Sequence, residues 1–262
     1  MLGLILGTAA PHLLPTEEGE NLWVDTPHGK PSDVIRLYTL KSKRIAVLSR
    51  HGPNHNIPPH RINHRANIAA LKEVGVRRIV GFSSSGVINT EFMLGELVVP
   101  HDFIDFSPVT HTYYDGPQVY HIAMQNPFCP VLRRGVTKIC AELGVPHRGE
   151  GVYVNTKGPR FETPAEIEAY RILGADIVGM TLAPEAVLAR EQGLCYAGVC
   201  TTDNYASGIS KTPLSFEDVR KNVEKSIPNL RRLIAKLAVV SFDDMSCDCA
   251  EALTKANASK YG

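Results

Sequence analysis

Short apolar runs alternate along the chain with longer segments of helical period. The runs are LGLIL from residue 2, RIAVLS from residue 44, RRIVGFSSSG from residue 77, and later ELVVPHDFI, GVYVNT, ADIVGMT and CYAGVCTTDN. Strands separated in this way by helical segments are typical of an α/β domain built on one central sheet. The sequence therefore predicts an α/β fold.

Two segments have a clear helical pattern, residues 65–76 and residues 215–240. In the second, Ser215 stands three residues before Asp218, which is the spacing of a capping box. Pro228 lies inside this segment and is expected to kink or split the helix. Nothing resembling a linker precedes about residue 240. We therefore expect one domain over residues 1–240 and a C-terminal tail over residues 241–262.

Polar residues follow three of the predicted strands, in the stretches GTAA, SRHG and SSSG. We expect three turns there, which would together offer Thr8, Arg50, His51 and the serines at 83–85. An arginine fork, a histidine and hydroxyls beside backbone N–H groups form a cradle for a small oxyanion. Any one of these stretches alone is more simply explained as an ordinary turn.

The charge balance limits the kinds of partner. The chain has 262 residues with 28 basic and 27 acidic side chains, so its formal net charge is +1. That balance gives no broad electrostatic field for nucleic acid or an anionic membrane, and an anion must be bound locally. The apolar start meets Gly7, Thr8 and Pro11 well before membrane-spanning length. A cytoplasmic protein is expected.

A metal site is not predicted. Residues 50–67 carry four histidines, but Pro58 and Pro59 interrupt the run, and zinc sites usually use compact spacers or a histidine pair one helical turn apart. These residues are better interpreted as polar loop histidines with one functional member. The four are His51, His55, His60 and His64. Four cysteines are also scattered without metal-ligand spacing, namely Cys129, Cys140, Cys195 and Cys200.

Cys247 and Cys249 differ from the other cysteines because only one residue separates them, in the polar tail. The simplest interpretation is two exposed thiols. A C-x-C pair can also form a strained bridge or pair elsewhere, and a cytosolic disulfide is plausible mainly in a hyperthermophile. The sequence leaves these alternatives open.

Several long motifs, in order, resemble the trimeric purine nucleoside phosphorylase and methylthioadenosine phosphorylase family. They are SRHGPNHNIPPHRINHRANIAALKEVGV, DGPQVYHIAMQNPFCP, GPRFET and GMTLAPEAVLARE, and the resemblance runs from about Gly3 to Leu237. It is greatest to the S-methyl-5′-thioinosine phosphorylases. The resemblance implies a phosphorylase/hydrolase-like fold with a central mixed β-sheet flanked by helices. It also implies a homotrimer or a dimer of trimers, with no metal or organic cofactor.

The implied reaction is phosphorolysis, in which phosphate attacks C1′ of a purine nucleoside and releases the free base. By matching motif positions, the resemblance implies phosphate binding by Thr8, Arg50, His51, Ser83, Ser84 and Thr181. It places Met180 under the ribose, Phe161 against the base and His121 in a neighbouring subunit's site. Asn204 and His51 are the implied catalytic residues. The turns GTAA and SSSG depart from the family pattern but keep hydrogen-bond donors.

Glu162 bears on which purine is cleaved. An ionised carboxylate can only accept hydrogen bonds, so it would pair with the N1–H of a 6-oxopurine and would face the N1 of adenine acceptor to acceptor. GPRFET resembles the 6-oxopurine members, whereas adenine-type members have a small hydroxyl residue at that position. Asn204 falls where 6-oxopurine enzymes carry Asn, although a one-residue shift would put Asp203 there and favour adenine.

The 5′ end of the sugar is assigned through Phe216. Nucleoside-type members place a histidine at that position, and an apolar ring suits a methylthio group better than a hydroxyl. Phe216 could equally be a packing residue at a helix start. S-methyl-5′-thioinosine is therefore the first expected substrate, with inosine or guanosine and S-methyl-5′-thioadenosine as alternatives. A non-catalytic nucleoside-binding protein is a further alternative, which phosphate-dependent release of base would distinguish.

Overall fold

The computed structural model describes residues 1–14, 18–210, 215–242 and 246–256, with the side chains of Phe216 and Asp218 outside the description. In this part of the chain, no helix combines the length and apolar character needed to cross a membrane. The capping box expected at Ser215 therefore stays a prediction, since it depends on the Asp218 side chain.

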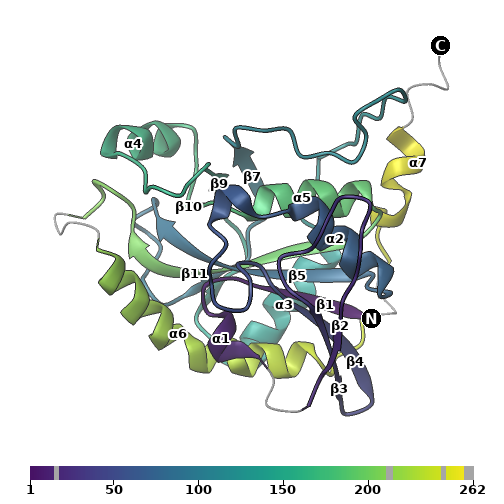
Figure 1. Cartoon of the computed structure of the whole chain (residues 1–262). Coiled ribbons are helices and arrows are strands. Elements are labelled where there is room, and N and C mark those ends of the chain that lie inside the picture. The colour runs from purple at the N-terminus through teal and green to yellow at the C-terminus, as the bar shows by residue number, and fades with distance from the viewer. Residues whose placement is uncertain (15–17, 211–214, 243–245, 257–262) are drawn as a thin grey trace.

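One mixed sheet of eleven strands forms the centre of the described structure (Figure 1). Its main path runs β2-β3-β4-β1-β5-β10-β9-β7, and β11 adds to β5 while β6 and β8 extend from β11. The strands are β1 (Leu2–Leu6), β2 (Glu20–Leu22), β3 (Ile35–Leu40), β4 (Lys43–Ser49), β5 (Arg78–Val87), β6 (Leu97–Val98), β7 (Asp102–Asp105), β8 (His147–Arg148), β9 (Val152–Asn155), β10 (Ile177–Gly179) and β11 (Cys195–Tyr205). The predicted α/β fold with a central mixed sheet is confirmed.

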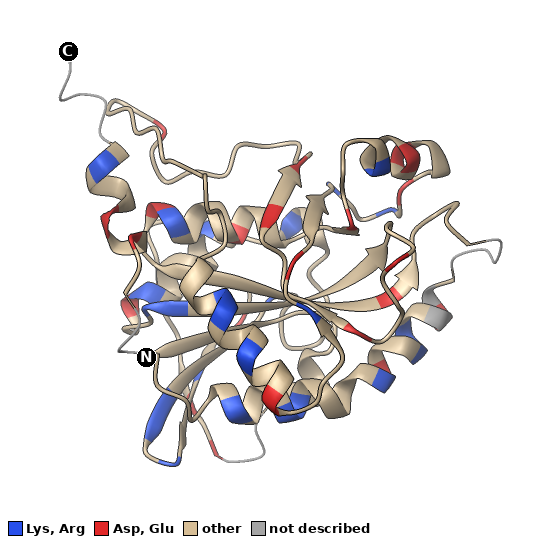
Figure 2. Cartoon of the chain, turned by 180° about the vertical axis from the view of Figure 1, so that it is seen from behind, with Lys and Arg blue, Asp and Glu red and all other residues tan. Residues whose placement is uncertain are grey.

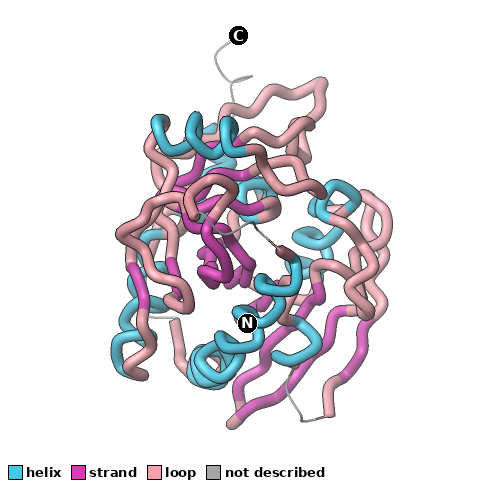
Figure 3. The backbone as a smooth tube through the Cα atoms, turned by 90° about the vertical axis from the view of Figure 1, so that its left-hand side faces the viewer, coloured by secondary structure: helices cyan, strands magenta, loops and turns pink. Residues whose placement is uncertain are grey.

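Helices cover both faces of the sheet, as the side view shows (Figure 3). They are α1 (Ala10–Leu13), α2 (His64–Glu73), α3 (Pro130–Glu142), α4 (Pro164–Ile172), α5 (Leu182–Glu191), α6 (Phe216–Leu237) and α7 (Ala252–Ala256), with 3₁₀ turns at Pro59–Arg61 and Cys249–Glu251. The pleat of β1 explains how two cores arise, because successive side chains point to opposite faces. Leu4 and Leu6 pack with α3 and α6, while Ile5 packs with α2 and α5.

Three sequence expectations about these elements need correction. The serines at 83–85 do not form a turn, because β5 continues through them to Val87 with β11 paired along its whole length. Pro228 does not split its segment, since α6 is one helix of 22 residues that contains it, and the expected kink stays a prediction. Of the run ADIVGMT, only Ile177–Gly179 is a strand, and α5 begins soon after it at Leu182.

Acidic and basic residues are mixed along the strands and helices in the rear view (Figure 2). This mixture is what the near-zero formal net charge leads one to expect. Any strong local field must come from buried groups, where water screens charges less than at the surface.

Candidate active site

A cavity of about 420 Å³ opens where β1, β4 and β10 end and where β5 and β11 pass. This volume is typical of a site for a small ligand. Ten of the residues expected from the sequence lie on its wall: Thr8, Arg50, His51, Ser83, Ser84, Phe161, Glu162, Met180, Thr181 and Asn204. The structure thus brings the proposed phosphate, sugar and base contacts together in one place.

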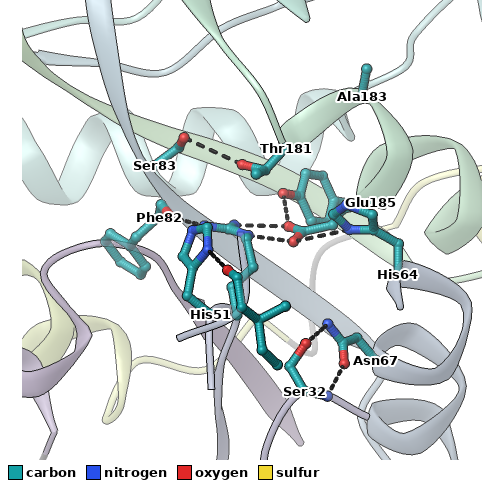
Figure 4. A network of polar contacts seen from close by, with 12 residues as sticks. Ser32, His51, His64, Asn67, Phe82, Ser83, Thr181, Ala183 and Glu185 are labelled. Carbon is teal, nitrogen blue, oxygen red and sulfur yellow. Dashed lines mark hydrogen bonds and ion pairs between the residues drawn. The ribbon is translucent and has the colours of Figure 1, made fainter. Parts of the chain in front are cut away.

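Arg50 is fixed by a buried ion pair with Glu185 of α5 (Figure 4). Its Nε and Nη2 donate to the two carboxylate oxygens at 2.5 and 2.9 Å, and its Nη1 donates to the Phe82 carbonyl at 2.5 Å. The Tyr196 hydroxyl donates to the same carboxylate at 2.6 Å. Burial opposes ionisation of Glu185, but the charge and hydrogen bonds of Arg50 hold its pKa at about 2. The guanidinium is therefore held charged and in one orientation at the cavity wall.

Gly7 allows the guanidinium to lie this close to the backbone. A Cβ atom at this position would come within 2.7 Å of Arg50 Nη1 and 2.7 Å of the Phe82 carbonyl oxygen. Neither the buried ion pair nor the strand backbone can move aside easily. A residue with a side chain at position 7 would therefore displace Arg50 from the cavity wall.

His51 is neutral near pH 7. Burial, and then the positive charge of Arg50, lower its pKa to about 4. Its Nδ1 lies 2.8 Å from the Ile57 carbonyl, which can only accept, so Nδ1 carries the proton and Nε2 has a free lone pair. His51 can therefore accept a hydrogen bond from a ligand through Nε2.

Hydroxyl groups lie beside these two residues. Ser83 Oγ and Thr181 Oγ1 are 3.4 Å apart, which brings a residue of β5 against the residue that precedes α5 (Figure 4). The Thr181 N–H donates to the Tyr153 hydroxyl at 3.1 Å, which fixes the backbone at this helix start. A pair of hydroxyls at a helix N-terminus suits an anion, because the helix dipole is positive there.

Asp203 does not line the cavity, which corrects its expected place among the base contacts. Its Oδ2 accepts from Ser84 Oγ and from Thr201 Oγ1, both at 2.5 Å. The reason is a bulge in β11, where Thr202 pairs with Ser85 and Asn204 pairs with Gly86, so that Asp203 is the extra residue. A bulge re-aims side chains, and here it sends Asp203 beneath Ser84 while Asn204 reaches the cavity.

We expect Asp203→Asn to change the pH dependence of stability. Burial raises the pKa of Asp203 from 3.8 to about 6, although Ser84 and Thr201 donate to it. A raised pKa in the folded state gives a stabilising contribution that is full below about pH 4 and is lost as the pH rises through about 6. The free energy of unfolding of the variant, relative to that of the wild type, should therefore rise by about 2 kcal/mol from pH 4 to pH 7.5. Urea unfolding at the two pH values measures this difference. Asp25→Asn, at an exposed position, is the control. An unchanged difference between variant and wild type at the two pH values would contradict the assignment.

Glu162 also lines the cavity, with 9% of its surface exposed. The Thr156 hydroxyl donates to its Oε1 at 2.6 Å and fixes the carboxylate. Phe161 beside it is 42% exposed at the mouth of the cavity, which is a suitable place for a flat ligand to stack. Met180 lies on the cavity wall, with its sulfur close to Gly158.

Among the described residues, His121 is an expected site residue that does not line the cavity, and Phe216 cannot be placed. His121 is exposed, and its backbone N–H donates to the Ala256 carbonyl of α7 at 3.0 Å. Phe216 is the first residue of α6, and its side chain lies outside the described residues. Their proposed roles stay predictions.

Sequence reasoning missed the residues that support the cavity from behind. Glu185 is fully buried under Arg50, and His64 Nδ1 lies 3.7 Å from the same carboxylate. A usable signal was present, because Glu185 is an acid in the otherwise apolar run TLAPEAVLA, and a buried acid needs a partner. Thr156 next to the GPRFET motif carried no comparable signal.

Comparison with known proteins places the chain among nucleoside phosphorylases. The Phosphorylase superfamily matches residues 2–238. The chain is 39% identical to S-methyl-5′-thioadenosine phosphorylase of Nitrosopumilus maritimus, over 97% of each chain. It is 40% identical to 6-oxopurine nucleoside phosphorylase of Pyrococcus furiosus, covering 95% of this chain and 96% of that one. It is 42% identical to a probable S-methyl-5′-thioinosine phosphorylase of Methanopyrus kandleri, covering 96% and 97%.

The fold agrees with that of a solved relative. Methylthioadenosine phosphorylase from Schistosoma mansoni, in complex with adenine, superposes with a TM-score of 0.90 at 27% identity, covering 98% of this chain and 99% of that one. Similarity at this level fixes the architecture and the class of reaction, while relatives of near-equal identity differ in their named substrates.

Proposed function

Since the chain belongs to the phosphorylase superfamily, we propose that its preferred reaction is the cleavage of S-methyl-5′-thioinosine by phosphate. The products are hypoxanthine and 5-methylthioribose 1-phosphate. The coarser assignment rests on the family itself, because the chain is a purine nucleoside phosphorylase, which is a pentosyltransferase. The finer assignment rests on the arrangement of the cavity.

Phosphate is proposed to bind between Arg50, His51 and the hydroxyl groups of Ser83, Ser84 and Thr181. Arg50 supplies fixed positive charge, because Glu185 holds its guanidinium at the cavity wall. At neutral pH inorganic phosphate keeps at least one P–OH group, and the Nε2 lone pair of neutral His51 can accept a hydrogen bond from it. Thr8 completes the cradle at the end of β1.

The sugar is proposed to lie over Met180, between the phosphate and the base. Cleavage of a glycosidic bond passes through an oxocarbenium-like sugar. The phosphate anion would stabilise the developing positive charge, while the purine leaves with the bonding electrons. The polarisable thioether of Met180 gives an adaptable apolar surface for the sugar.

Glu162 carries the choice of a 6-oxopurine. Its carboxylate lies on the cavity wall, and the Thr156 hydroxyl donates to Oε1, as expected for an acceptor group. A carboxylate there would accept the N1–H of hypoxanthine and would repel the N1 of adenine. Asn204, also on the wall, has an amide group that can donate to N7 or O6 as negative charge builds on the leaving base.

We propose a methylthio group at the 5′ position on the strength of Phe216, which starts α6 next to the cavity residue Val219. Inosine or guanosine is the alternative if the Phe216 ring does not face the sugar. We also propose self-association as a homotrimer or a dimer of trimers, with exposed His121 reaching a neighbouring site. Residues 1–240 would form the catalytic domain and residues 241–262 the tail.

Glu162→Gln tests the base assignment. A glutamine can both donate and accept, so it removes the penalty against adenine and weakens the charged contact to N1–H. We expect the ratio of kcat/KM for methylthioinosine to kcat/KM for methylthioadenosine to fall about 10- to 100-fold, the worth of a hydrogen bond to a charged group. Glu166→Gln, on the exposed start of α4, is the matched control. An unchanged ratio in Glu162→Gln would show that Glu162 does not contact the base.

A further inference from the structure

Four of the six cysteines of the chain lie together, and none of them lines the cavity. Cys129 precedes α3, Cys195 begins β11, and Cys247 and Cys249 come from the C-terminal tail. Their four sulfur atoms all lie within 4.8 Å of one another. From this arrangement we propose that the four thiolates bind one Zn²⁺ ion, which fixes the tail to the domain. The spacing of these cysteines along the chain gave no indication of a metal site. The proposal replaces the expectation that the chain binds no metal.

The sulfur positions fit the tetrahedral geometry of zinc. With Zn–S bonds of about 2.3 Å, the sulfur atoms of a four-thiolate site are about 3.8 Å apart. Here the Sγ atoms of Cys195 and Cys247 are 3.3 Å apart, and no pair in the group exceeds 4.8 Å. A cluster of two or four irons would spread the thiolates around several metal ions, whereas this close group fits a single ion.

Surrounding donors suit a negatively charged zinc tetrathiolate. The Leu132 N–H, in the first turn of α3, points at Cys129 Sγ at 3.5 Å, and Arg190 Nη1 lies 3.5 Å from Cys249 Sγ. Arg190 also pairs with Asp248, the residue between the two tail cysteines. Donors of this kind orient metal ligands and offset their charge. Cys129 and Cys249 are each 2% exposed, so neither is the exposed thiol that the sequence suggested for Cys249.

Disulfide bonding explains the arrangement less well. The Sγ atoms of Cys195 and Cys247 are 3.3 Å apart, against about 2.05 Å in a disulfide bond, and all four cysteines are free thiols. Bridging would also draw the four thiols into two pairs and would need an oxidant. In the observed group, all four sulfur atoms lie within 4.8 Å of one another, as binding to one central ion requires.

The ion would connect the tail to two regions of the domain. Arg190 lies on α5, the helix that carries Glu185. In the tail, α7 accepts the backbone N–H of His121 through the Ala256 carbonyl, so the tail also holds the loop that carries His121. Zinc would therefore stabilise this corner of the molecule without taking part in the reaction.

The test is the metal content of the full chain, purified anaerobically without chelator or reductant after growth with zinc. We expect one zinc per chain by elemental analysis and six titratable thiols after denaturation with a chelator. Cobalt should replace zinc and give the visible absorption of a tetrahedral thiolate site. Removing the ion under reducing conditions should lower the melting temperature by roughly 5 °C and speed amide exchange at residues 247–256 and at His121.

Cys247→Ala separates this site from other zinc binding, because Cys247 is a half-buried tail residue whose loss leaves the core intact. It should abolish stoichiometric zinc, whereas Cys140→Ala, a buried cysteine of α3 outside the group, should retain it. Any of three results would overturn the proposal: iron in place of zinc, a metal-free chain with two disulfides and two free thiols, or full zinc content in Cys247→Ala.

Discussion

Glu185→Ala is expected to lower the free energy of unfolding by about 3–5 kcal/mol, because it leaves the buried Arg50 charge without its partner. The same change should raise the KM for phosphate, since the guanidinium is then free to leave the cavity wall. Denaturant unfolding and phosphate-dependent kinetics measure the two effects. Tyr196→Phe is the matched control, because it removes one hydrogen bond to the carboxylate and keeps the ion pair. It should cost only about 1 kcal/mol.

A double variant separates stability from phosphate binding. In Arg50→Met with Glu185→Leu, both charges are replaced by apolar groups of similar volume, and stability should return close to that of the wild type. Phosphate use should still be lost, because the fixed positive charge is gone. If the double variant retained phosphate-dependent turnover, Arg50 would not be a phosphate ligand.

Asn204→Ala is expected to lower kcat about 100- to 1,000-fold, the usual cost of losing a donor that stabilises charge in the transition state. The KM for nucleoside should change less, because the contact strengthens as the base departs. Steady-state kinetics with methylthioinosine at saturating phosphate measure both parameters.

Asn204→Asp keeps the size of the side chain and removes its donor, so it is the sharper companion variant. It should lose 6-oxopurine turnover about as much as Asn204→Ala does, while activity on methylthioadenosine falls less. Equal activity of the wild type and both variants on methylthioinosine would contradict a role for Asn204 at the base.

Local patterns predicted the strands and the positions of the main cavity residues. Arg50 and His51 could be placed because they follow an apolar run directly, and strand ends in α/β sheets gather ligand sites. Glu162 could be assigned to the cavity because the motif GPRFET resembles that of known enzymes. The pattern of apolar and polar residues around it gave no such indication. Each of these inferences depends on residues close together in the chain.

Long-range contacts explain what the sequence could not provide. The serines at 83–85 read as a turn, yet β11 pairs alongside them and extends the strand. The bulge that separates Asp203 from Asn204 arises from the same pairing, so the sequence could not decide between them. Arg50 and Glu185 are 135 residues apart, and the four cysteines come from three distant segments. No local rule connects such positions.

The most direct test of the proposed substrate is kcat/KM of the wild type for methylthioinosine, methylthioadenosine, inosine and guanosine, each with and without phosphate. We predict phosphate-dependent release of base with the highest kcat/KM for methylthioinosine, and inosine ahead of methylthioadenosine if only the base is discriminated. A preference for methylthioadenosine would contradict the assignment of Glu162 to the purine N1–H, and release of base that does not depend on phosphate would contradict the binding role of Arg50.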